Sequence, residues 1–370
     1  MLNNHNLKYM DKKNIIIIIL LIIVIGIVAF WFYNNPPLVT PPPIVNNEFK
    51  VTRNEISEED NERIIAVSYP STGIKEIDDE IKNYVDEQIK TFKEIEYVSF
   101  GREGMKYYLY IEYFSTTLNK DIISFKFNTS DFTGGAHGNQ GVVCFTYNIK
   151  EKKKLELSDF FNNESYLQTI SDYAVADLLN GQYAEETWVK EGAGPKIENY
   201  DRFIVTENTF IFFFPPYQVA PYAAGEQQTI ILFSSLKDIL NPSMFSNFDF
   251  SVNKGIYILT PVKNETIGSS AIVEGADNYF IRVEGYLNGN GWAPFEAVGG
   301  RVELKDENNN VLVSSSLDIP GNWMKIPVYF RAYLFFNPGN SKTGTLVFHN
   351  DNASGLDENN REFSLPINFK

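Results

Sequence analysis

Residues 130–141 read S-D-F-T-G-G-A-H-G-N-Q-G and separate two runs of chain with strand-like patterns. In the preceding run, residues 121–129, apolar side chains alternate with polar ones, and residues 142–149 are rich in β-branched and aromatic side chains. Both patterns predict strands. A short glycine-rich segment between two strands predicts the connection of a β-hairpin. This hairpin indicates that the first globular region is built on a sheet.

Helical patterns lie on both sides of the hairpin. Residues 72–98 carry apolar side chains at intervals of three or four, which predicts an amphipathic helix. Residues 158–179 predict a second helix, with Ser158 or Asn162 as its N-cap. Further strands are predicted at residues 105–115, 203–205, 209–214 and 229–233. Residues 48–240 are therefore predicted to form an α+β domain with helices on a mainly antiparallel sheet.

Helix signals are missing from the last third of the chain. Short apolar runs such as Y-F-I-R-V-E-G-Y and G-T-L-V-F-H-N follow one another, and polar turns such as K-D-E-N-N-N separate some of them. This spacing predicts an all-β immunoglobulin-like sandwich over residues 254–370. The insert around Trp292 and Phe295 has two interpretations, because these rings either sit exposed or fill the core.

The N-terminal region carries a membrane signal. Residues 15–33 contain no charge, and a helix of that length spans about 28 Å, close to the thickness of a bilayer core. Lysines precede the run, which predicts a transmembrane signal anchor with residues 1–14 in the cytoplasm and the bulk of the chain extracytoplasmic. A cleaved signal peptide is the alternative, but its apolar part is shorter and ends in small residues. Residues 34–47 are proline-rich and predict an extended linker.

The charge of the chain restricts its partners. Its formal net charge is -15 and its sequence pI is about 4.8. Such an acidic surface repels phosphate backbones, so nucleic acid is excluded, while a cationic protein or ligand is attracted. The only cysteine, Cys144, lies in an apolar run, which is typical of a small buried hydrophobe.

Chemistry-bearing motifs are scarce. The chain has three histidines, and none of them pairs with another histidine or with cysteines at the spacing of a zinc site. No G-x-S-x-G nucleophile turn is present. We therefore predict no metal, no cofactor and no catalytic residue. A carboxylate pair for glycoside cleavage stays open, because 47 acidic residues make chance pairs inevitable.

Two segments supply candidate ligand-binding residues. The glycines of G-G-A-H-G allow positive φ or close backbone approach, and a structural role for this turn is favoured over a recognition loop. In P-P-Y-Q-V-A-P-Y-A-A-G, residues 215–225, the tyrosines are either packed rings or an aromatic contact surface. The candidates are Gly134, Gly135, His137, Gly138, Tyr217 and Tyr222.

These two motifs, with K-L-E-L-S-D-F-F between them, resemble the extracytoplasmic domain shared by RsiV-type anti-sigma factors and PdaC-type peptidoglycan deacetylases. The resemblance covers about residues 60–240. It implies an α+β module that binds extracellular ligands, which in RsiV-type members is lysozyme. It does not imply catalysis, because chemistry in the deacetylases belongs to a separate domain. The chain lacks an RsiV-like sigma-binding segment and a following deacetylase domain.

The second globular region resembles the immunoglobulin-like domain of bacterial spore-germination proteins, on Y-I-L-T-P-V-K-N-E-T-I, G-R-V-E-L-K-D-E-N-N-N and G-T-L-V-F-H-N-D-N-A-S-G. That resemblance implies an extracellular binding or structural module. The combined prediction is a non-enzymatic, membrane-anchored receptor or adaptor for a lysozyme-like cationic protein or for cell-wall glycan. The alternatives are a cell-wall-polymer hydrolase with a carboxylate pair and a purely structural envelope component.

Overall fold

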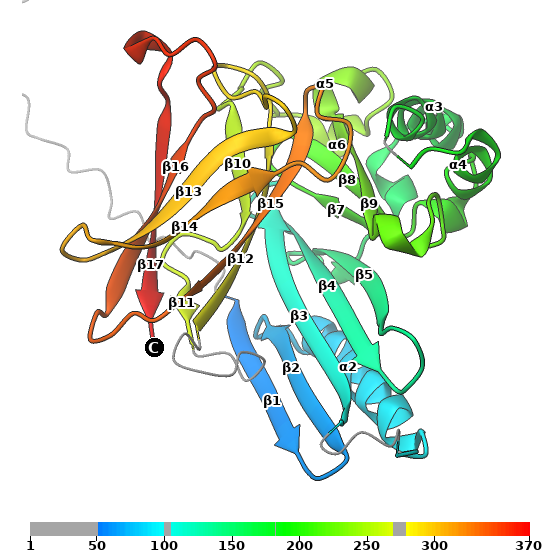
Figure 1. The fold of residues 1–370 in the computed structure, drawn as a ribbon. Coiled ribbons are helices and arrows are strands. Elements are labelled where there is room, and N and C mark those ends of the chain that lie inside the picture. The colour runs from blue at the N-terminus through cyan, green and yellow to red at the C-terminus, as the bar shows by residue number, and fades with distance from the viewer. Residues whose placement is uncertain (1–50, 100–104, 182, 269–278) are drawn as a thin grey trace, which may run out of the picture. The chain divides into compact units, whose positions relative to one another are not determined.

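Three β-sheets form the framework of the computed structural model, which describes residues 51–99, 105–181, 183–268 and 279–370 (Figure 1). The first sheet has six strands in the order of the chain. They are β1 (Thr52–Glu59), β2 (Arg63–Ser71), β3 (Tyr107–Thr117), β4 (Ile122–Phe132), β5 (Asn139–Asn148) and β6 (Lys153–Lys154). All neighbours pair antiparallel except β2 and β3, which are parallel, so the sheet is mixed.

Helix α2 (Lys75–Glu94) covers one face of this sheet, and Figure 1 shows it lying along strands β2 to β4. Its stripe of Ile77, Ile81, Val85, Ile89 and Phe92 is buried against alternate side chains of the strands. Burial of such an apolar stripe, rather than intrinsic propensity, stabilises a helix of this kind. The predicted helix and the predicted β4–β5 hairpin are both confirmed.

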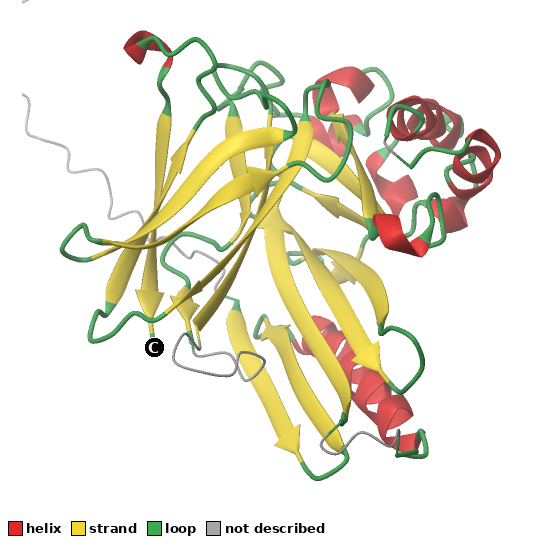
Figure 2. Cartoon of the chain, in the orientation of Figure 1, coloured by secondary structure: helices red, strands yellow, loops and turns green. Residues whose placement is uncertain are grey.

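The second sheet contains three antiparallel strands, β7 (Phe203–Val205), β8 (Thr209–Phe214) and β9 (Gln227–Leu232). Its phenylalanines form a core with helices that gather beside it in Figure 2. These helices are α3 (Tyr166–Leu178), α4 (Glu186–Gly192), α5 (Phe233–Leu236) and α6 (Pro242–Phe245), with 3₁₀ turns at Leu157–Phe160, Ile197–Asn199 and Tyr222–Ala224.

The helix predicted at residues 158–179 begins later than its pattern indicates. Phe160 and Phe161 are both buried, and Phe161 bridges to Leu240. The side chain of Asn162 donates a hydrogen bond to the carbonyl of Leu240. Ser158 lies within the 3₁₀ turn at Leu157–Phe160, and the chain is extended at Phe161, so neither Ser158 nor Asn162 is the N-cap and α3 starts after Ser165.

The third sheet has eight strands, in the order β10, β12, β15, β14, β13, β16, β17, β11. Their bounds are β10 (Ile256–Thr260), β11 (Thr266–Ile267), β12 (Tyr279–Leu287), β13 (Val298–Asp306), β14 (Val311–Asp318), β15 (Val328–Phe336), β16 (Thr343–His349) and β17 (Glu362–Phe369), with a 3₁₀ turn at Asp357–Asn359. A single residue pair, Asp318 with Arg331, joins β14 to β15.

This sheet folds over on itself. Side chains from all the strands β10 and β12 to β17 share one core, and Phe369 of β17 contacts Tyr279 of β12 and Phe336 of β15. The predicted sheet-rich C-terminal part is confirmed, whereas its immunoglobulin-like character stays a prediction. Trp292 is 4% exposed and fills this core, while Phe295 is 48% exposed.

Residues 49–370 cluster as one compact unit. A fourth core joins strands of all three sheets through Phe114, Ile211, Phe213, Tyr286 and Tyr329. The division into domains at residues 48–240 and 254–370 stays a prediction. The predicted transmembrane anchor at residues 15–33 lies outside the described residues, and none of the described helices has the length and apolar character to cross a bilayer.

Candidate functional site

The two motifs singled out in the sequence meet in space. The imidazole of His137, in the β4–β5 turn, stacks on the ring of Tyr222, with 4.0 Å between ring centroids. The Tyr222 hydroxyl donates a hydrogen bond to the Gly138 carbonyl, and Nδ1 of His137 lies 2.9 Å from the same oxygen. These contacts fix the hairpin turn against the 215–225 loop.

Glycine is required in this turn for two different reasons. Gly134 and Gly135 have φ of 100° and 101°, which side-chain-bearing residues rarely adopt. Gly138 has an ordinary φ, but a Cβ on it would lie 2.8 Å from both the Asp131 carbonyl oxygen and the Tyr108 hydroxyl. The glycines therefore shape this turn, and its contact with Tyr222 places it beside an open groove, while the preference for a structural role over a recognition loop stays a prediction.

Tyr217 continues the aromatic contact toward solvent. It is 57% exposed, and its ring centroid lies 5.7 Å from that of Tyr222. Trp188 of α4 donates its indole N–H to the Tyr217 carbonyl at 2.8 Å, which holds the loop in place. The six predicted candidate residues thus lie in one neighbourhood, although their role in ligand binding stays a prediction.

A groove of about 550 Å³ borders this neighbourhood. Tyr222, Ala224 and Gly225 form one wall. The opposing walls come from β3, β4 and β5 of the first sheet and from β12 and β15 of the third. The polar and aromatic side chains that line it are Tyr110, Glu112, Asn128, Thr129, Ser130, Gln140, Glu226, Arg282, Arg331 and Tyr333.

The alternation of side chains along strands explains why these residues face one space. In β12, Ile281 and Val283 point into the core of the third sheet, so Arg282 and Glu284 face the other way. In β4, Phe125 and Phe127 pack on α2, so Lys126 and Asn128 face the groove side. The groove therefore lies where the outer faces of two sheets diverge.

Buried charges close the inner end of the groove. Nζ of Lys126, with no exposed surface, lies 2.8 Å from Glu226 Oε1 and 3.9 Å from Glu284 Oε2. It also lies 4.2 Å from the ring centroid of Phe213, a cation–π contact. The fully buried Glu284 carboxylate further contacts the Arg282 guanidinium and the Tyr329 hydroxyl. This ion network links the two sheets directly beneath the lining residues.

The thiol of Cys144 and the possible metal ligands of the described chain show no sign of a reactive site. Burial raises the pKa of the Cys144 thiol far above its ordinary range, so the thiol is protonated at neutral pH. Within residues 51–99, 105–181, 183–268 and 279–370, histidine, cysteine and carboxylate side chains nowhere gather in a set of three that could hold a metal ion.

The fold combines helices with three β-sheets around one groove, and comparisons with known proteins match parts of its N-terminal half. Residues 56–140 match the family model described as deacetylase PdaC. Residues 158–234 match the model of DUF3298, described as a protein of unknown function. The predicted resemblance to PdaC-type proteins is therefore confirmed for this region, which matches the PdaC and DUF3298 family models.

The chain is also similar to proteins of known sequence and structure. The peptidoglycan-N-acetylmuramic acid deacetylase PdaC of Bacillus subtilis is 31% identical over 179 residues, which are 47% of this chain and 38% of that protein. Crystal structures of DUF3298 family proteins from Bacteroides fragilis and Pseudomonas aeruginosa are 17% and 13% identical, with TM-scores of 0.38 and 0.39. They cover 54% and 53% of this chain, and 97% of each crystallised chain.

The expectation that the protein is not an enzyme is wrong. Both the family model matched by residues 56–140 and the B. subtilis relative carry the name of a deacetylase, which points to an enzyme-related protein. The prediction rested on the scarcity of catalytic motifs in this chain. Motifs in one chain carry no information about the activities of related proteins. The chain spans about two fifths of that relative's length.

Sequence reasoning missed most of the groove. Tyr110, Glu112, Arg282, Arg331 and Tyr333 were not candidates, because they are distributed over three strands that lie far apart in the sequence. The available signal was a charged residue at the centre of an apolar strand, as in Y-F-I-R-V-E-G-Y. A buried strand carries such charges only where they find partners or face a site.

Proposed function

We propose that this protein binds the glycan strands of bacterial peptidoglycan in the groove between β3–β5, β12, β15 and the 215–225 loop. The observation that carries the proposal is the lining of the groove, which combines three tyrosines with amides, hydroxyls and arginines. The printed name of the B. subtilis relative supports peptidoglycan as the polymer. The predicted extracytoplasmic location, with an anchor at residues 15–33, is part of this proposal.

The lining suits a sugar chain. Tyr110, Tyr222 and Tyr333 offer rings that pack on the apolar faces of sugars while their hydroxyls meet polar groups. Asn128, Gln140 and neighbouring hydroxyls supply donors and acceptors for sugar hydroxyls and N-acetyl groups. A volume of about 550 Å³ lies within the range of ordinary ligand sites.

The two arginines add selectivity for muramic acid units. Arg282 and Arg331 line the groove from adjacent strands, and N-acetylmuramic acid carries a lactyl group that ends in a carboxyl or an amide. Guanidinium groups bind carboxylates through paired N–H donors. We therefore expect muramic-acid-containing fragments to bind more tightly than chains of N-acetylglucosamine.

The biochemical role of this binding is proposed to be peptidoglycan deacetylation, the activity in the relative's name. Release of acetate from purified peptidoglycan, measured with the full chain and with the Tyr333→Ala variant, tests this step. Acetate release that depends on Tyr333 supports it. If the polymer keeps its acetyl groups although the protein is saturated with it, the proposed deacetylation is wrong and only the proposed binding stands.

The binding itself is tested by titrating the protein with soluble peptidoglycan fragments and following heat or tryptophan fluorescence. We expect saturable binding that weakens about tenfold in Tyr333→Ala, since stacking on a tyrosine contributes on the order of 1 kcal/mol. Tyr183→Ala is the matched control, because Tyr183 is 45% exposed and does not line the groove. Equal affinity of the three proteins, or no binding at all, overturns the proposal.

A cationic protein such as lysozyme is a second candidate partner, and the net charge of -15 favours it. Pull-down of lysozyme should then be saturable and should be lost at high salt, because screening weakens attraction between exposed charges. The same experiment with Tyr333→Ala separates the two candidates, since charge attraction does not depend on this ring.

A further inference from the structure

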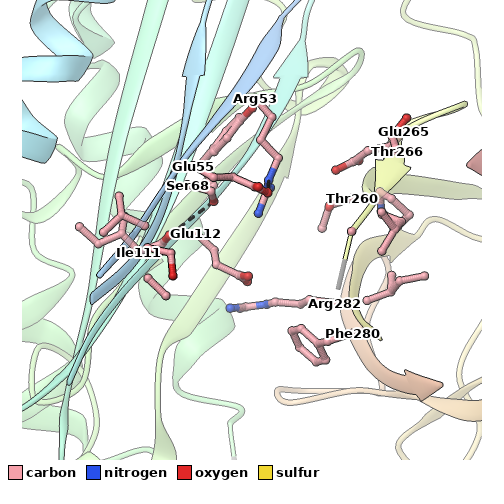
Figure 3. Close-up of a pocket in the computed structure, with 18 of the residues that line it drawn as sticks. Arg53, Glu55, Ser68, Ile111, Glu112, Thr260, Glu265, Thr266, Phe280 and Arg282 are labelled. Carbon is pink, nitrogen blue, oxygen red and sulfur yellow. Dashed lines mark hydrogen bonds and ion pairs between the residues drawn. The ribbon is translucent and has the colours of Figure 1, made fainter. Parts of the chain in front are cut away.

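A second cavity adjoins the groove. It has a volume of about 270 Å³ and lies between β1–β3 of the first sheet and β10–β12 of the third (Figure 3). Glu112 and Arg282 line both this cavity and the groove. Figure 3 shows these two side chains reaching toward each other from the two sheets, so they mark the boundary. A ligand seated in the groove can extend past them.

The lining of this cavity is ionic and of mixed sign. Arg53, Glu55 and Glu112 come from the first sheet, and Glu265 and Arg282 come from the third. A chain of sugars carries few charges, so it does not complement such a charged lining. The small volume and the alternating charges instead match a compact group that bears both an ammonium and a carboxylate.

Arg53 and Arg282 each keep N–H donors that can bind a ligand. Arg53 uses Nε to bind Glu55 at 3.2 Å, and Arg282 contacts Glu284 beneath the cavity. A guanidinium has five N–H donors, so each arginine can still bind an incoming carboxylate. Figure 3 shows the guanidinium of Arg53 directed into the space between the sheets.

The carboxylates complement an ammonium group. Glu112 and Glu265 form no ion pair with a lysine or arginine among the described residues. The Glu265 carboxylate accepts a hydrogen bond of 2.8 Å from the backbone N–H of Val262, which fixes the position of its side chain at the cavity wall. An ammonium ion between these carboxylates would replace solvent with charge-assisted hydrogen bonds.

We propose that this cavity binds the zwitterionic end of a peptide stem attached to the glycan, an amino-acid centre that carries a free ammonium and a free carboxylate. This inference rests on the proposed function, because the groove places the glycan. It adds a specificity site, so the protein distinguishes peptide-bearing muramic acid units from bare glycan.

The test compares three probes with the full-length protein: peptidoglycan fragments with their stem peptide, the same fragments after enzymatic removal of the peptide, and the peptide alone. We expect peptide-bearing fragments to bind about tenfold tighter than peptide-free ones, because charge-assisted bonds are the added contacts. Arg53→Gln and Glu265→Gln line only the cavity and should abolish this difference without changing the affinity for peptide-free fragments.

Controls make each outcome decisive. Glu186→Gln and Arg301→Gln remove charges from exposed pairs on α4 and β13 and should keep the tenfold difference. Far-ultraviolet circular dichroism confirms that each variant is folded. Equal affinity of wild type for both fragments, or a difference that survives in both cavity variants, overturns the inference. If no fragment binds but the peptide alone binds through Arg53, the proposed glycan groove fails and the cavity stands.

Discussion

The outer face of strands β12 and β15 is sealed at one end and open at the other. At the sealed end, Tyr286, Glu284 and Tyr329 are at most 5% exposed and pack against the first two sheets. At the open end, Tyr333 and Phe335 are 40% and 52% exposed. Both ends carry aromatic rings and charged groups at every second position, so their surroundings contribute strongly to what they do.

The difference teaches how one strand face serves two purposes. Where the sheets touch, water is excluded, and each polar group must find a protein partner at the cost of its hydration. Where they diverge, the same groups keep their water and can exchange it for a ligand. The sealed end should therefore control stability, and the open end should control binding.

The largest effect is expected at Lys126, the cation of the sealed end. Lys126→Ala removes the partner of two carboxylates, one of them fully buried, and leaves a void beside Phe213. Breaking a buried ion pair by removing one partner costs about 3–5 kcal/mol in free energy of unfolding. Urea denaturation measures the loss.

Lys120→Ala, at an exposed lysine between β3 and β4, is the control and should unfold like wild type. Lys126→Met should lose less stability than Lys126→Ala, because methionine keeps most of the side-chain volume beside Phe213 and leaves no void. A loss below about 1 kcal/mol in Lys126→Ala would show that the interface is hydrated and that the two ends do not differ.

A smaller effect is expected at Tyr286. Its ring stacks on Tyr257 with 4.6 Å between centroids, and its hydroxyl bonds to the side chains of Asn208 and Thr206. Tyr286→Phe keeps the ring and removes the hydroxyl, which should cost about 1–2 kcal/mol because buried partners lose a hydrogen bond. The same change at exposed Tyr183 should cost nothing measurable, and equal unfolding midpoints for both variants would contradict the sealed character of this end.

The sequence predicted those parts of the fold whose pattern is local. The apolar spacing of residues 72–98 gave α2, and the glycine-rich turn at 130–141 gave the β4–β5 hairpin. Strands β1 and β2 were missed. β1 is an edge strand that exposes most of its side chains, and β2 pairs in parallel with a strand that follows a helix. β1 therefore shows little apolar alternation, whereas the alternation of Ile65, Val67 and Tyr69 in β2 was present and was overlooked.

The site was predictable only in part, for the same reason. His137 and Tyr222 were found because glycine- and proline-rich loops are conspicuous in sequence, and their mutual stacking joins the two motifs. Tyr110 and Arg282 lie on one groove although 171 positions separate them in the chain, from 110 to 282 exclusive. Their meeting depends on how two sheets pack, and no periodicity within either strand carries that information.

The cavity between the first and third sheets predicts a pH-dependent effect at Glu265. Burial raises the pKa of this carboxyl above its ordinary value, against opposing effects of the Val262 N–H and Arg53. A group whose pKa is higher in the folded state binds more protons there, so stability falls as pH rises through the interval between the two pKa values. The ionised carboxylate thus lowers stability at neutral pH.

Glu265→Gln should therefore raise Tm at pH 7, and the gain should shrink as the pH falls toward about 4.5, since wild type becomes protonated in the folded state above that pH. Thermal unfolding of both proteins across this range measures it. Glu186→Gln, on an exposed helix pair, should show no such trend. A gain that stays constant with pH would mean that the Glu265 carboxyl is not desolvated in the folded protein.

The smallest change in stability is expected at Tyr333, at the open end, where the binding effect is proposed to be large. Its ring stacks on Phe280 at 6.1 Å between centroids and is 40% exposed, so Tyr333→Ala should change the free energy of unfolding by no more than about 0.5 kcal/mol. Urea denaturation and fragment titration on the same preparation give both quantities. A binding defect accompanied by a loss of more than about 1 kcal/mol in free energy of unfolding would make Tyr333 a packing residue like Tyr286. Truncation of a side chain that packs in a sheet interface destabilises the protein whether or not a ligand is present. A large loss of affinity with little loss of stability in Tyr333→Ala would show that this end of the strand face binds ligand. A loss of both would show that this end only packs against the rest of the protein.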